Sequence, residues 1–206
     1  MKHVPGVMSA KPENLSRPLL LERKWLYGIA VAGLALLTVA GAKVSIPLPG
    51  TPVPGTLQTL PVLLAGLMLG SRRGAFSQAA YLGLGLAGLP VFALPGAGFG
   101  YLLGPTGGYL LGFVAAPLIV GGLAPPVRTP GFPRRLTAVT AGILTIHAAG
   151  VIWLSLFYLP TPGDALRAGS LPFLGFDVAK GILACGLASA AGLVARNAPW
   201  TNRFSG

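Results

Sequence analysis

Charged residues are scarce in this chain of 206 residues, and acidic residues are the scarcest. Only 9% of the residues are charged, and just four are Asp or Glu, against 15 that are Lys or Arg. Soluble domains carry about a quarter charged residues. With 53% hydrophobic residues and a mean hydropathy of +0.73, the composition excludes an ordinary soluble domain and indicates an integral membrane protein.

Other absences narrow the class of function. The single cysteine, Cys185, excludes an internal disulfide and a multi-cysteine metal site, so we expect a packing residue there and predict neither a metal nor a cofactor. The sequence has no G-x-x-x-x-G-K-[ST] loop with which to hydrolyse ATP. It also has no H-E-x-x-H and no G-x-S-x-G motif. Metal-dependent, acyl-transfer and phosphoryl-transfer enzymes therefore lack their parts in this chain.

Long uncharged stretches are what the chain has instead. Residues 44–71, 74–127 and 136–163 contain no Asp, Glu, Lys or Arg, and a membrane-spanning helix needs about 20 mostly apolar residues. We predict an all-α integral membrane protein with six transmembrane helices and no competing strands. Loops are expected to complete the short second and third crossings. The predicted spans are 25–42, 57–70, 74–90, 107–123, 136–159 and 173–195.

Basic residues are distributed unevenly over the predicted connections. With the N-terminus inside, most of them fall on inner segments, whereas the outer loops hold only Lys43 and Arg167. This positive-inside pattern places both termini in the cytoplasm and accounts for the net charge of +11 without a nucleic-acid partner. We predict a cytoplasmic tail over 1–24, a membrane domain over 25–195 with its first helix retained, and a second cytoplasmic tail over 196–206. The inner basic residues are Lys2, Lys11, Arg17, Arg23, Lys24, Arg72, Arg73, Arg128, Arg134, Arg135, Arg196 and Arg203.

The predicted outer connections are long, irregular and rich in Gly and Pro, at residues 43–59, 89–108 and 160–172. Irregular backbone near membrane depth is tolerated only where protein buries it or where it lines a cavity. We therefore expect these loops to cap a ligand cavity on the outer side of the bundle. Within the second loop, Thr106 is a predicted helix N-cap, and Gly107 and Gly108 are expected to leave helix N–H groups open to that cavity.

Two ionisable residues lie within the last predicted span. Asp177 and Lys180 are three residues apart, so they share a helix face near its outer end. Either ion costs about 2.5–3.5 kcal/mol at mid-bilayer, and intramembrane ions are by default functional candidates. We expect the pair to supply the anionic acceptor and the cationic donor of the cavity. The alternative is a structural pair that fixes helix packing.

Three weaker features accompany this pair. His147 lies in the middle of a span and could act as a proton relay, although a hydrogen-bonded structural histidine is the favoured interpretation. Residues 83–88 match G-x-G-x-x-G but lack a strand context, so their glycines indicate close helix packing. Gly28 and Ala32 are spaced to form a small-residue contact face for a partner subunit.

Four segments together carry a family likeness: IPLPGTPVPGTLQTLPVLLAGLMLG (46–70), GLPVFA (88–93), LLGPTGGYLLGF (102–113) and FDVAKG (176–181). In matching order, from about residue 25 to 195, they resemble the biotin-specific substrate-binding component (BioY) of energy-coupling-factor vitamin transporters. The resemblance implies a six-helix protein in the plasma membrane of a prokaryote that captures biotin from outside and is not an enzyme. It also implies two partners besides the lipid bilayer, a transmembrane coupling protein and a pair of ATP-binding-cassette ATPases.

The resemblance also implies roles for particular residues. Asp177 and Lys180 are expected to reach the vitamin, the loop around residues 45–56 to act as a lid, and Gln58 to be a polar contact just beyond it. Gly96 and Leu110 stand where some members carry Asn and Arg, so backbone groups or Tyr101 and Tyr109 should replace those contacts. A strict A-x-x-x-A on the first helix is missing, and Gly28 with Ala32 is only an approximate substitute. The expected ligand contacts are Asp177, Lys180, Gln58, Tyr101, Tyr109, Gly96 and Gly98. The expected lid residues are Pro49, Thr51, Pro52 and Pro54.

Alternatives to ATP-driven biotin capture stay open at this point. One is a stand-alone facilitator of biotin or a similar vitamin. Another is an intramembrane enzyme with His147 or Asp177 as its base. A purely structural scaffold does not explain why the irregular segments all fall on one side.

Overall fold

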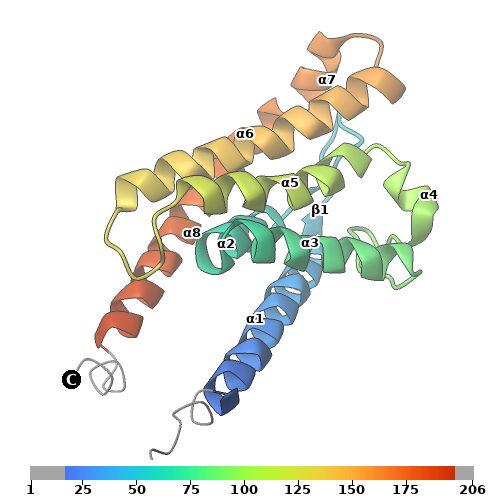
Figure 1. The fold of residues 1–206 in the computed structure, drawn as a ribbon. Coiled ribbons are helices and arrows are strands. Elements are labelled where there is room, and N and C mark those ends of the chain that lie inside the picture. Colours follow the sequence, from blue (N-terminus) through green and yellow to red (C-terminus); the bar gives the residue numbers. More distant parts are fainter. Residues whose placement is uncertain (1–16, 198–206) are drawn as a thin grey trace, which may run out of the picture.

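The computed structural model describes residues 17–197 (Figure 1). Most of the two predicted tails lies outside this range, including Lys2, Lys11 and Arg203. Within it, helices dominate, and their order is α1 (Arg17–Lys43), α2 (Thr59–Leu69), α3 (Ser71–Leu86), α4 (Gly98–Leu102), α5 (Gly107–Leu123), α6 (Phe132–Phe157), α7 (Pro162–Gly169) and α8 (Leu171–Asn197). Two short strands, β1 (Ser45–Ile46) and β2 (Gly55–Thr56), lie between α1 and α2.

Three of the described helices are long and apolar enough to cross a membrane: Trp25–Lys43 within α1, α6 and α8. The helices α2 and α5 are apolar but shorter. The bounds of α5 are those predicted from the sequence, because Gly and Pro residues bracket its apolar run on both sides. The predicted span 74–90 is shifted, since α3 begins at Ser71 and ends at Leu86.

The expectation that no strands compete is wrong in one loop. β1 and β2 pair antiparallel, with Ser45 opposite Thr56 and Ile46 opposite Gly55. Four prolines lie between these strands, and proline has no N–H to donate to a ladder, so the pairing stops after two residues on each side. Gly50 supplies a positive φ of 80° at the far end of this hairpin. Residues 45–56 are called the hairpin below.

The centre of the bundle is α2. Most of its residues are buried, and Val62, Leu63 and Ala65 have no exposed surface at all. It packs against α1, α3, α5 and α8, which explains why it is apolar all round rather than on one stripe. Its 11 residues span only about 16 Å, roughly half the hydrocarbon thickness of a bilayer.

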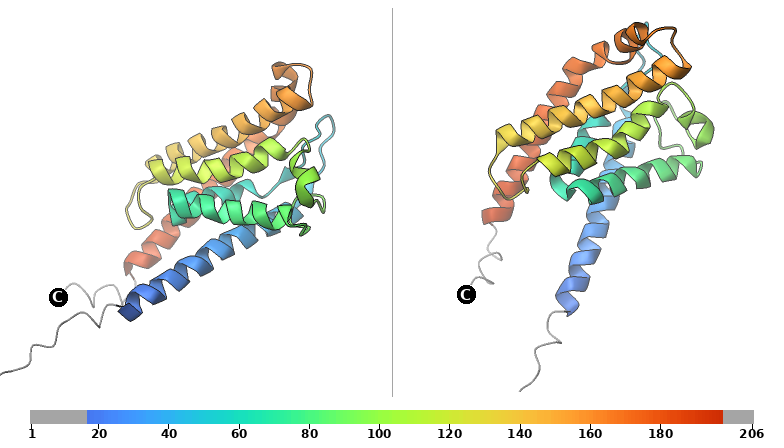
Figure 2. Two further views of the ribbon diagram at one scale, coloured as in Figure 1. Left: turned by 45° about the vertical axis from the view of Figure 1, so that its right-hand side comes forward. Right: turned by 45° about the horizontal axis from the view of Figure 1, so that its top comes forward.

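The remaining long helices surround α2 in an arc. Neighbours along the arc are α1 and α3, α3 and α5, α5 and α6, then α6 and α8, and Figures 1 and 2 show α3, α5 and α6 side by side. Small residues bring α5 and α6 close together. A Cβ on Gly112 would lie 3.0 Å from the Ile146 Cα, and one on Gly108 would collide with Trp153.

This packing corrects the predicted role of Gly107 and Gly108. The Gly107 N–H donates to the Gly104 carbonyl at 3.0 Å, and Gly108 lies against α6. Neither residue is among those that line the cavity described below. Thr106 is the N-cap residue of α5 as predicted, but its side chain makes no capping hydrogen bond.

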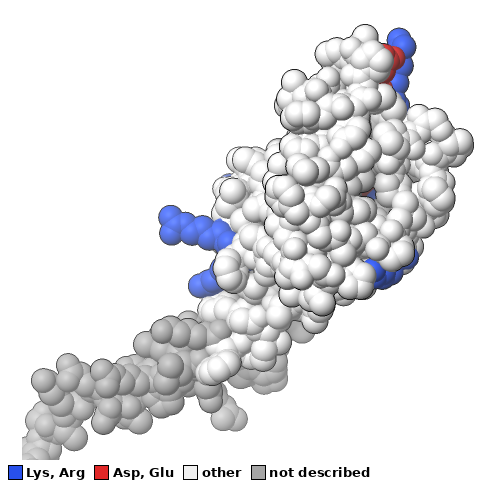
Figure 3. All heavy atoms as spheres, turned by 90° about the vertical axis from the view of Figure 1, so that its right-hand side faces the viewer, with Lys and Arg blue, Asp and Glu red and all other residues white. Residues whose placement is uncertain are grey.

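The connections separate into two groups at opposite ends of the bundle. The start of α1, the α2–α3 turn, the α5–α6 connection and the end of α8 lie at one end (Figures 1 and 2). The hairpin, α4 and α7 lie at the other. We call the first the basic end, because it carries Arg72, Arg73, Arg128 and Arg134, and the second the loop end. Figure 3 shows charged atoms only in small separate groups on an otherwise uncharged face.

One arginine at the basic end is buried. Arg135 lies in the first turn of α6 and is 2% exposed. Its guanidinium donates to the Ser189 hydroxyl at 2.9 Å and to the backbone carbonyls of Val127 at 2.8 Å, Thr129 at 2.7 Å and Pro126 at 3.3 Å. It therefore ties α6 to α8 and to the α5–α6 connection.

Candidate ligand-binding site

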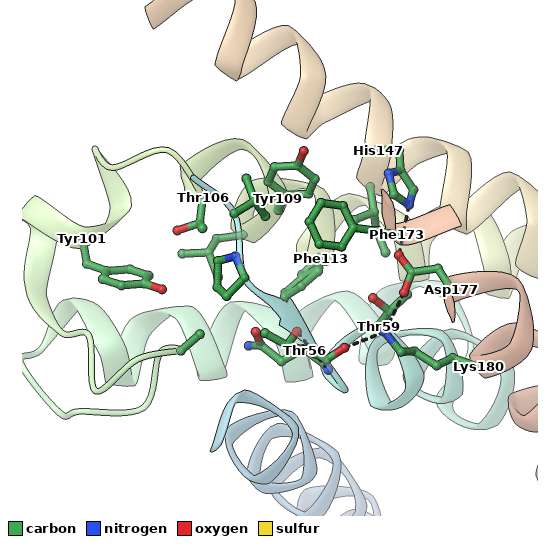
Figure 4. A pocket seen from close by; sticks show the side chains of 16 residues that line it. Thr56, Thr59, Tyr101, Thr106, Tyr109, Phe113, His147, Phe173, Asp177 and Lys180 are labelled. Atoms are coloured by element: carbon green, nitrogen blue, oxygen red, sulfur yellow. Dashed lines mark hydrogen bonds and ion pairs between the residues drawn. The ribbon is translucent and has the colours of Figure 1, made fainter. Parts of the chain in front are cut away.

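A cavity of about 560 Å³, its open mouth included, lies at the loop end of the bundle (Figure 4). Its lining of apolar and aromatic side chains with a few polar groups is typical of a small-molecule site. The hairpin and helices α2, α4, α5, α6 and α8 all contribute to its wall. The lining residues are Val53, Pro54, Thr56, Gln58, Thr59, Ala93, Tyr101, Thr106, Tyr109, Leu110, Phe113, Ile146, His147, Phe173, Asp177 and Lys180.

The predicted pair on the last helix is part of this wall. The Lys180 Nζ lies 2.8 Å from the Asp177 Oδ1, and the Asp177 residue is only 5% exposed. The same Lys180 ammonium donates to the Thr56 carbonyl of the hairpin at 2.5 Å. Figure 4 shows both contacts at one end of the cavity. One cation thus joins the carboxylate of α8 to the backbone of the hairpin.

His147 is a member of this cluster that sequence reasoning missed. Its Nε2 lies 3.0 Å from the Asp177 Oδ2, and its Nδ1 lies 3.0 Å from the Ser170 hydroxyl. The favoured interpretation of a buried, hydrogen-bonded histidine is confirmed, but its carboxylate partner is 30 residues away in sequence and gave no local signal. Because an ionised carboxylate only accepts hydrogen bonds, this network assigns the proton to Nε2.

The rest of the wall is apolar and aromatic. Phe113, Phe173, Leu110 and Ile146 line it, and none of them stood out in the sequence, because such residues are the ordinary content of a membrane helix. Tyr109 presents its ring to the cavity, while its hydroxyl donates to the Gly169 carbonyl. The Tyr109 hydroxyl therefore already has a hydrogen-bond acceptor within the protein.

Tyr101 and Gln58 also line the cavity, as expected. The Tyr101 ring stacks on Phe92, with ring centroids 4.9 Å apart and an interplanar angle of 19°. Burial raises the pKa of the Tyr101 hydroxyl, which keeps it a neutral donor. Gln58 is 4% exposed, and its amide nitrogen donates to the Tyr81 hydroxyl at 2.6 Å.

Other predicted residues lie outside the cavity wall. Gly96 and Gly98 do not line it, and among the expected lid residues only Pro54 does, whereas Pro49, Thr51 and Pro52 do not. Gly96 acts indirectly, because a Cβ at this position would collide with the Tyr101 ring. Its lack of a side chain lets Tyr101 take its place in the wall.

The predicted docking residues Gly28 and Ala32 lie on an exposed face of α1. No heavy atom comes within 4 Å of a Cβ built on Gly28. The neighbouring Tyr27 is covered by the Arg73 guanidinium, 3.8 Å above its ring. The surface around Gly28 is therefore open to a partner or to lipid.

This arrangement suits a ligand of mixed character. A carboxylate acceptor and an ammonium donor lie at one end of the cavity, and aromatic rings provide flat apolar walls. A compact molecule with N–H donors, an acceptor oxygen and an apolar body would satisfy both parts.

Comparison with known proteins places relatives beside this chain. The family model described as the BioY family matches residues 17–196. A probable biotin transporter BioY of Lysinibacillus sphaericus is 43% identical over 136 residues, which cover 66% of this chain and 68% of that protein. The biotin transporter BioY of Thermotoga maritima is 42% identical over 148 residues, covering 72% and 85%.

A solved structure is similar as well. The crystal structure of the S-component for biotin from an ECF-type ABC transporter superposes with a TM-score of 0.76 at 26% identity. The match covers 82% of this chain and 92% of that one.

Proposed function

Because the chain belongs to the BioY family, we propose that it is a transport protein that captures biotin at the loop end of its bundle. The observation that carries this proposal is the contact between buried Asp177 and partly buried Lys180 in a cavity that the hairpin lines. Relatives named as biotin transporters and a biotin S-component of similar structure support it.

The chemistry of biotin matches the two parts of the cavity. The ureido ring of the vitamin has two N–H donors and one carbonyl acceptor. An N–H can donate to Asp177, and the Lys180 ammonium can donate to the ureido carbonyl or to the ligand's carboxylate. The bicyclic body is apolar and fits against Phe113, Phe173 and the Tyr109 ring. The ligand needs no metal or cofactor to be held in this way.

The hairpin is proposed as the lid of the cavity. Thr56 and Pro54 line the cavity from the hairpin side, and the Thr56 carbonyl is held by Lys180. A cation that contacts both the ligand site and the lid links occupancy of the cavity to the position of the hairpin. Prolines within the hairpin limit the backbone entropy that ordering it costs.

The proposed membrane arrangement has six crossings, by α1, α2, α3, α5, α6 and α8. Both termini are placed in the cytoplasm of a prokaryote, and the loop end faces outward. The gathering of Arg72, Arg73, Arg128 and Arg134 at the end opposite the loops supports this orientation. Because α2 is about half as long as the bilayer core is thick, the hairpin completes its crossing.

We assign the chain two kinds of partner, a transmembrane coupling protein and a pair of ATP-binding-cassette ATPases. The likeness to an S-component of an ECF-type transporter supports this assignment. The absence of a phosphate-binding loop from the sequence fits a subunit that takes its energy from elsewhere. The open face of α1 around Gly28 and Ala32 is the proposed docking surface.

Binding of biotin to the purified protein in detergent tests the function. Asp177→Asn and Lys180→Ala should each weaken binding by about 1.5–3 kcal/mol, or about 10- to 150-fold, because each removes a buried charge-assisted hydrogen bond. Asp164→Asn and Arg167→Ala are matched controls, since this second acid–base pair is exposed on α7 at the same end. Both controls should bind like the wild type.

Two results would count against the proposal. Wild-type protein that does not bind biotin would remove the function, and unchanged affinity in both Asp177→Asn and Lys180→Ala would remove the site. Biotin uptake by the protein alone in liposomes, without any ATPase, would instead favour the stand-alone facilitator.

A further inference from the structure

His147 is a buried side chain in the cavity wall to which capture of biotin assigns no direct contact. It is 5% exposed, in the middle of α6, and its ring is nearly perpendicular to that of Tyr109, with centroids 6.4 Å apart and an interplanar angle of 86°. Its two nitrogens are both occupied, one by Asp177 and the other by Ser170. We propose that His147 is a positioning residue for ligand binding, which acts by holding the Asp177 carboxylate in the orientation that receives the ligand. This inference rests on the proposed function.

The geometry around Asp177 supports this role. Lys180 holds Oδ1 and His147 holds Oδ2, from opposite sides of the carboxylate (Figure 4). A carboxylate has about four lone-pair sites, so two remain after these contacts. With both oxygens tethered, the carboxylate plane cannot rotate, and the free lone pairs keep a constant direction. Without His147, only Lys180 would restrain it, and Lys180 shares its ammonium with Thr56.

A second contact connects His147 to the start of α8. The Ser170 hydroxyl, 3% exposed, lies between α7 and α8 and contacts the His147 Nδ1. Next to it, the Tyr109 hydroxyl donates to the Gly169 carbonyl. Side chains of α5 and α6 thus hold the α7–α8 junction, and Asp177 follows less than two turns into α8. His147 therefore fixes both the carboxylate and the helix that carries it.

The proton positions give the role a spectroscopic signature. If Nε2 donates to Asp177, then Nδ1 of the neutral ring accepts from Ser170. The chain has two histidines, His3 and His147, so a His3→Gln variant leaves a single imidazole to observe. In that background, ¹⁵N NMR of histidine-labelled protein should show the Nε2-protonated tautomer. Asp177→Asn should change the Nε2 resonance, because its acceptor is altered. A ring protonated at Nδ1 alone would overturn the proposal.

Three substitutions separate positioning from packing. His147→Leu removes the donor and keeps an apolar side chain, and it should weaken biotin binding about tenfold or more. His147→Gln places an amide donor near the position of Nε2 and should restore affinity to within about threefold of the wild type. Gln78→Leu is the matched control. It removes another fully buried polar side chain, which contacts Thr38 away from the cavity, and should leave affinity unchanged. Equal losses in His147→Leu and His147→Gln would show that the ring only fills space.

A double-mutant cycle tests whether His147 acts through Asp177. In the Asp177→Asn background, adding His147→Leu should change biotin affinity by no more than about twofold. A change of that size is within the scatter with which independent mutations add. Full additivity of the two losses would overturn the proposal. If the wild type fails to bind biotin, the proposed function fails while the NMR measurement still decides whether Asp177 sets the His147 tautomer. If His147→Leu does not fold, Ser170→Ala and His147→Gln carry the binding test.

Discussion

Two buried charges lie toward opposite ends of the bundle, and the protein holds them in different ways. Arg135, at the basic end, donates to three backbone carbonyls and one hydroxyl. Among residues 25–197, whose side chains the structure describes, it forms no ion pair with an acid. Asp177, toward the loop end, is held by the side chains of Lys180 and His147 and lines a cavity.

The difference separates a structural charge from a charge that we propose binds the ligand. The partners of Arg135 belong to the chain's own turns, so any rearrangement there would leave carbonyls unpaired, and burial with unpaired groups is costly. The partners of Asp177 use only part of its hydrogen-bonding capacity, and Asp177 lines the cavity in which we propose that the ligand binds. A buried ion inside a membrane protein therefore indicates a site only when its environment leaves room for a second molecule.

The largest effect is expected from Arg135→Ala, which should lower the stability of the protein. This change leaves a hydroxyl and three carbonyls without their donor, and each buried orphan group costs about 1–3 kcal/mol, so the loss of stability should be about 3 kcal/mol or more. Thermal unfolding in detergent would measure it as a large fall in the midpoint. At temperatures well below the unfolding midpoint, the affinity of the variant for biotin should equal that of the wild type. An Arg135→Ala variant that is stable but does not bind biotin would contradict the purely structural role given to Arg135.

The next largest effect is expected from Lys180→Met, which keeps most of the length of the side chain and removes its charge. Asp177 then loses its cation and the Thr56 carbonyl loses its donor. We expect biotin affinity to fall by about 1.5–3 kcal/mol. Amide hydrogen exchange within the hairpin should also quicken. Arg167→Met, on the exposed helix α7, is the control. Unchanged exchange in the hairpin would show that Lys180 does not hold it.

A smaller effect is expected from Gly96→Ala. The added methyl group would collide with the Tyr101 ring and push it from its place on Phe92. Overpacking of this kind costs about 1–3 kcal/mol, and it should lower biotin affinity severalfold through the displaced Tyr101. Gly100→Ala is a close control, because no atom lies within 4 Å of a Cβ built there. Equal behaviour of the two variants in a binding assay would refute the indirect role given to Gly96.

The smallest effect, again on the stability of the protein, is expected from Ser189→Ala at the basic end. It removes one acceptor of Arg135 and leaves the three carbonyls in place. The loss should be about 1 kcal/mol and visible only in the unfolding midpoint. A loss as large as that of Arg135→Ala would show that the hydroxyl, rather than the loop carbonyls, dominates the anchor.

Much of the fold was predictable from the sequence because membrane helices leave a strong local signal. Apolar runs bounded by Gly and Pro gave the bounds of α5 and came within a few residues of α2 and α8. Asp177 and Lys180 were predictable as a pair, because three residues along a helix bring two side chains to one face. The hairpin was missed, since two-residue strands among prolines have no period to detect.

The site was less predictable than the fold. His147 and Asp177 are 30 residues apart and lie on different helices, so no spacing rule connects them. Gly96 was predicted as a ligand contact, but its lack of a side chain makes room for Tyr101, and only the tertiary structure shows that distinction. Phe113 and Phe173 were hidden among many apolar residues of the same kind.

The sequence by itself determined that this chain is a membrane protein, how its basic residues are distributed between the connections, and which acid lies beside a lysine in an apolar helix. These properties follow from composition and from neighbours along one helix, where hydropathy and charge act locally. The tertiary structure alone decided that α2 fills the centre, that Arg135 is an anchor, and that His147 and Thr56 complete the Asp177–Lys180 cluster. Those contacts join helices and loops far apart in sequence, and they form only when small residues let the helices pack closely enough for buried polar groups to meet.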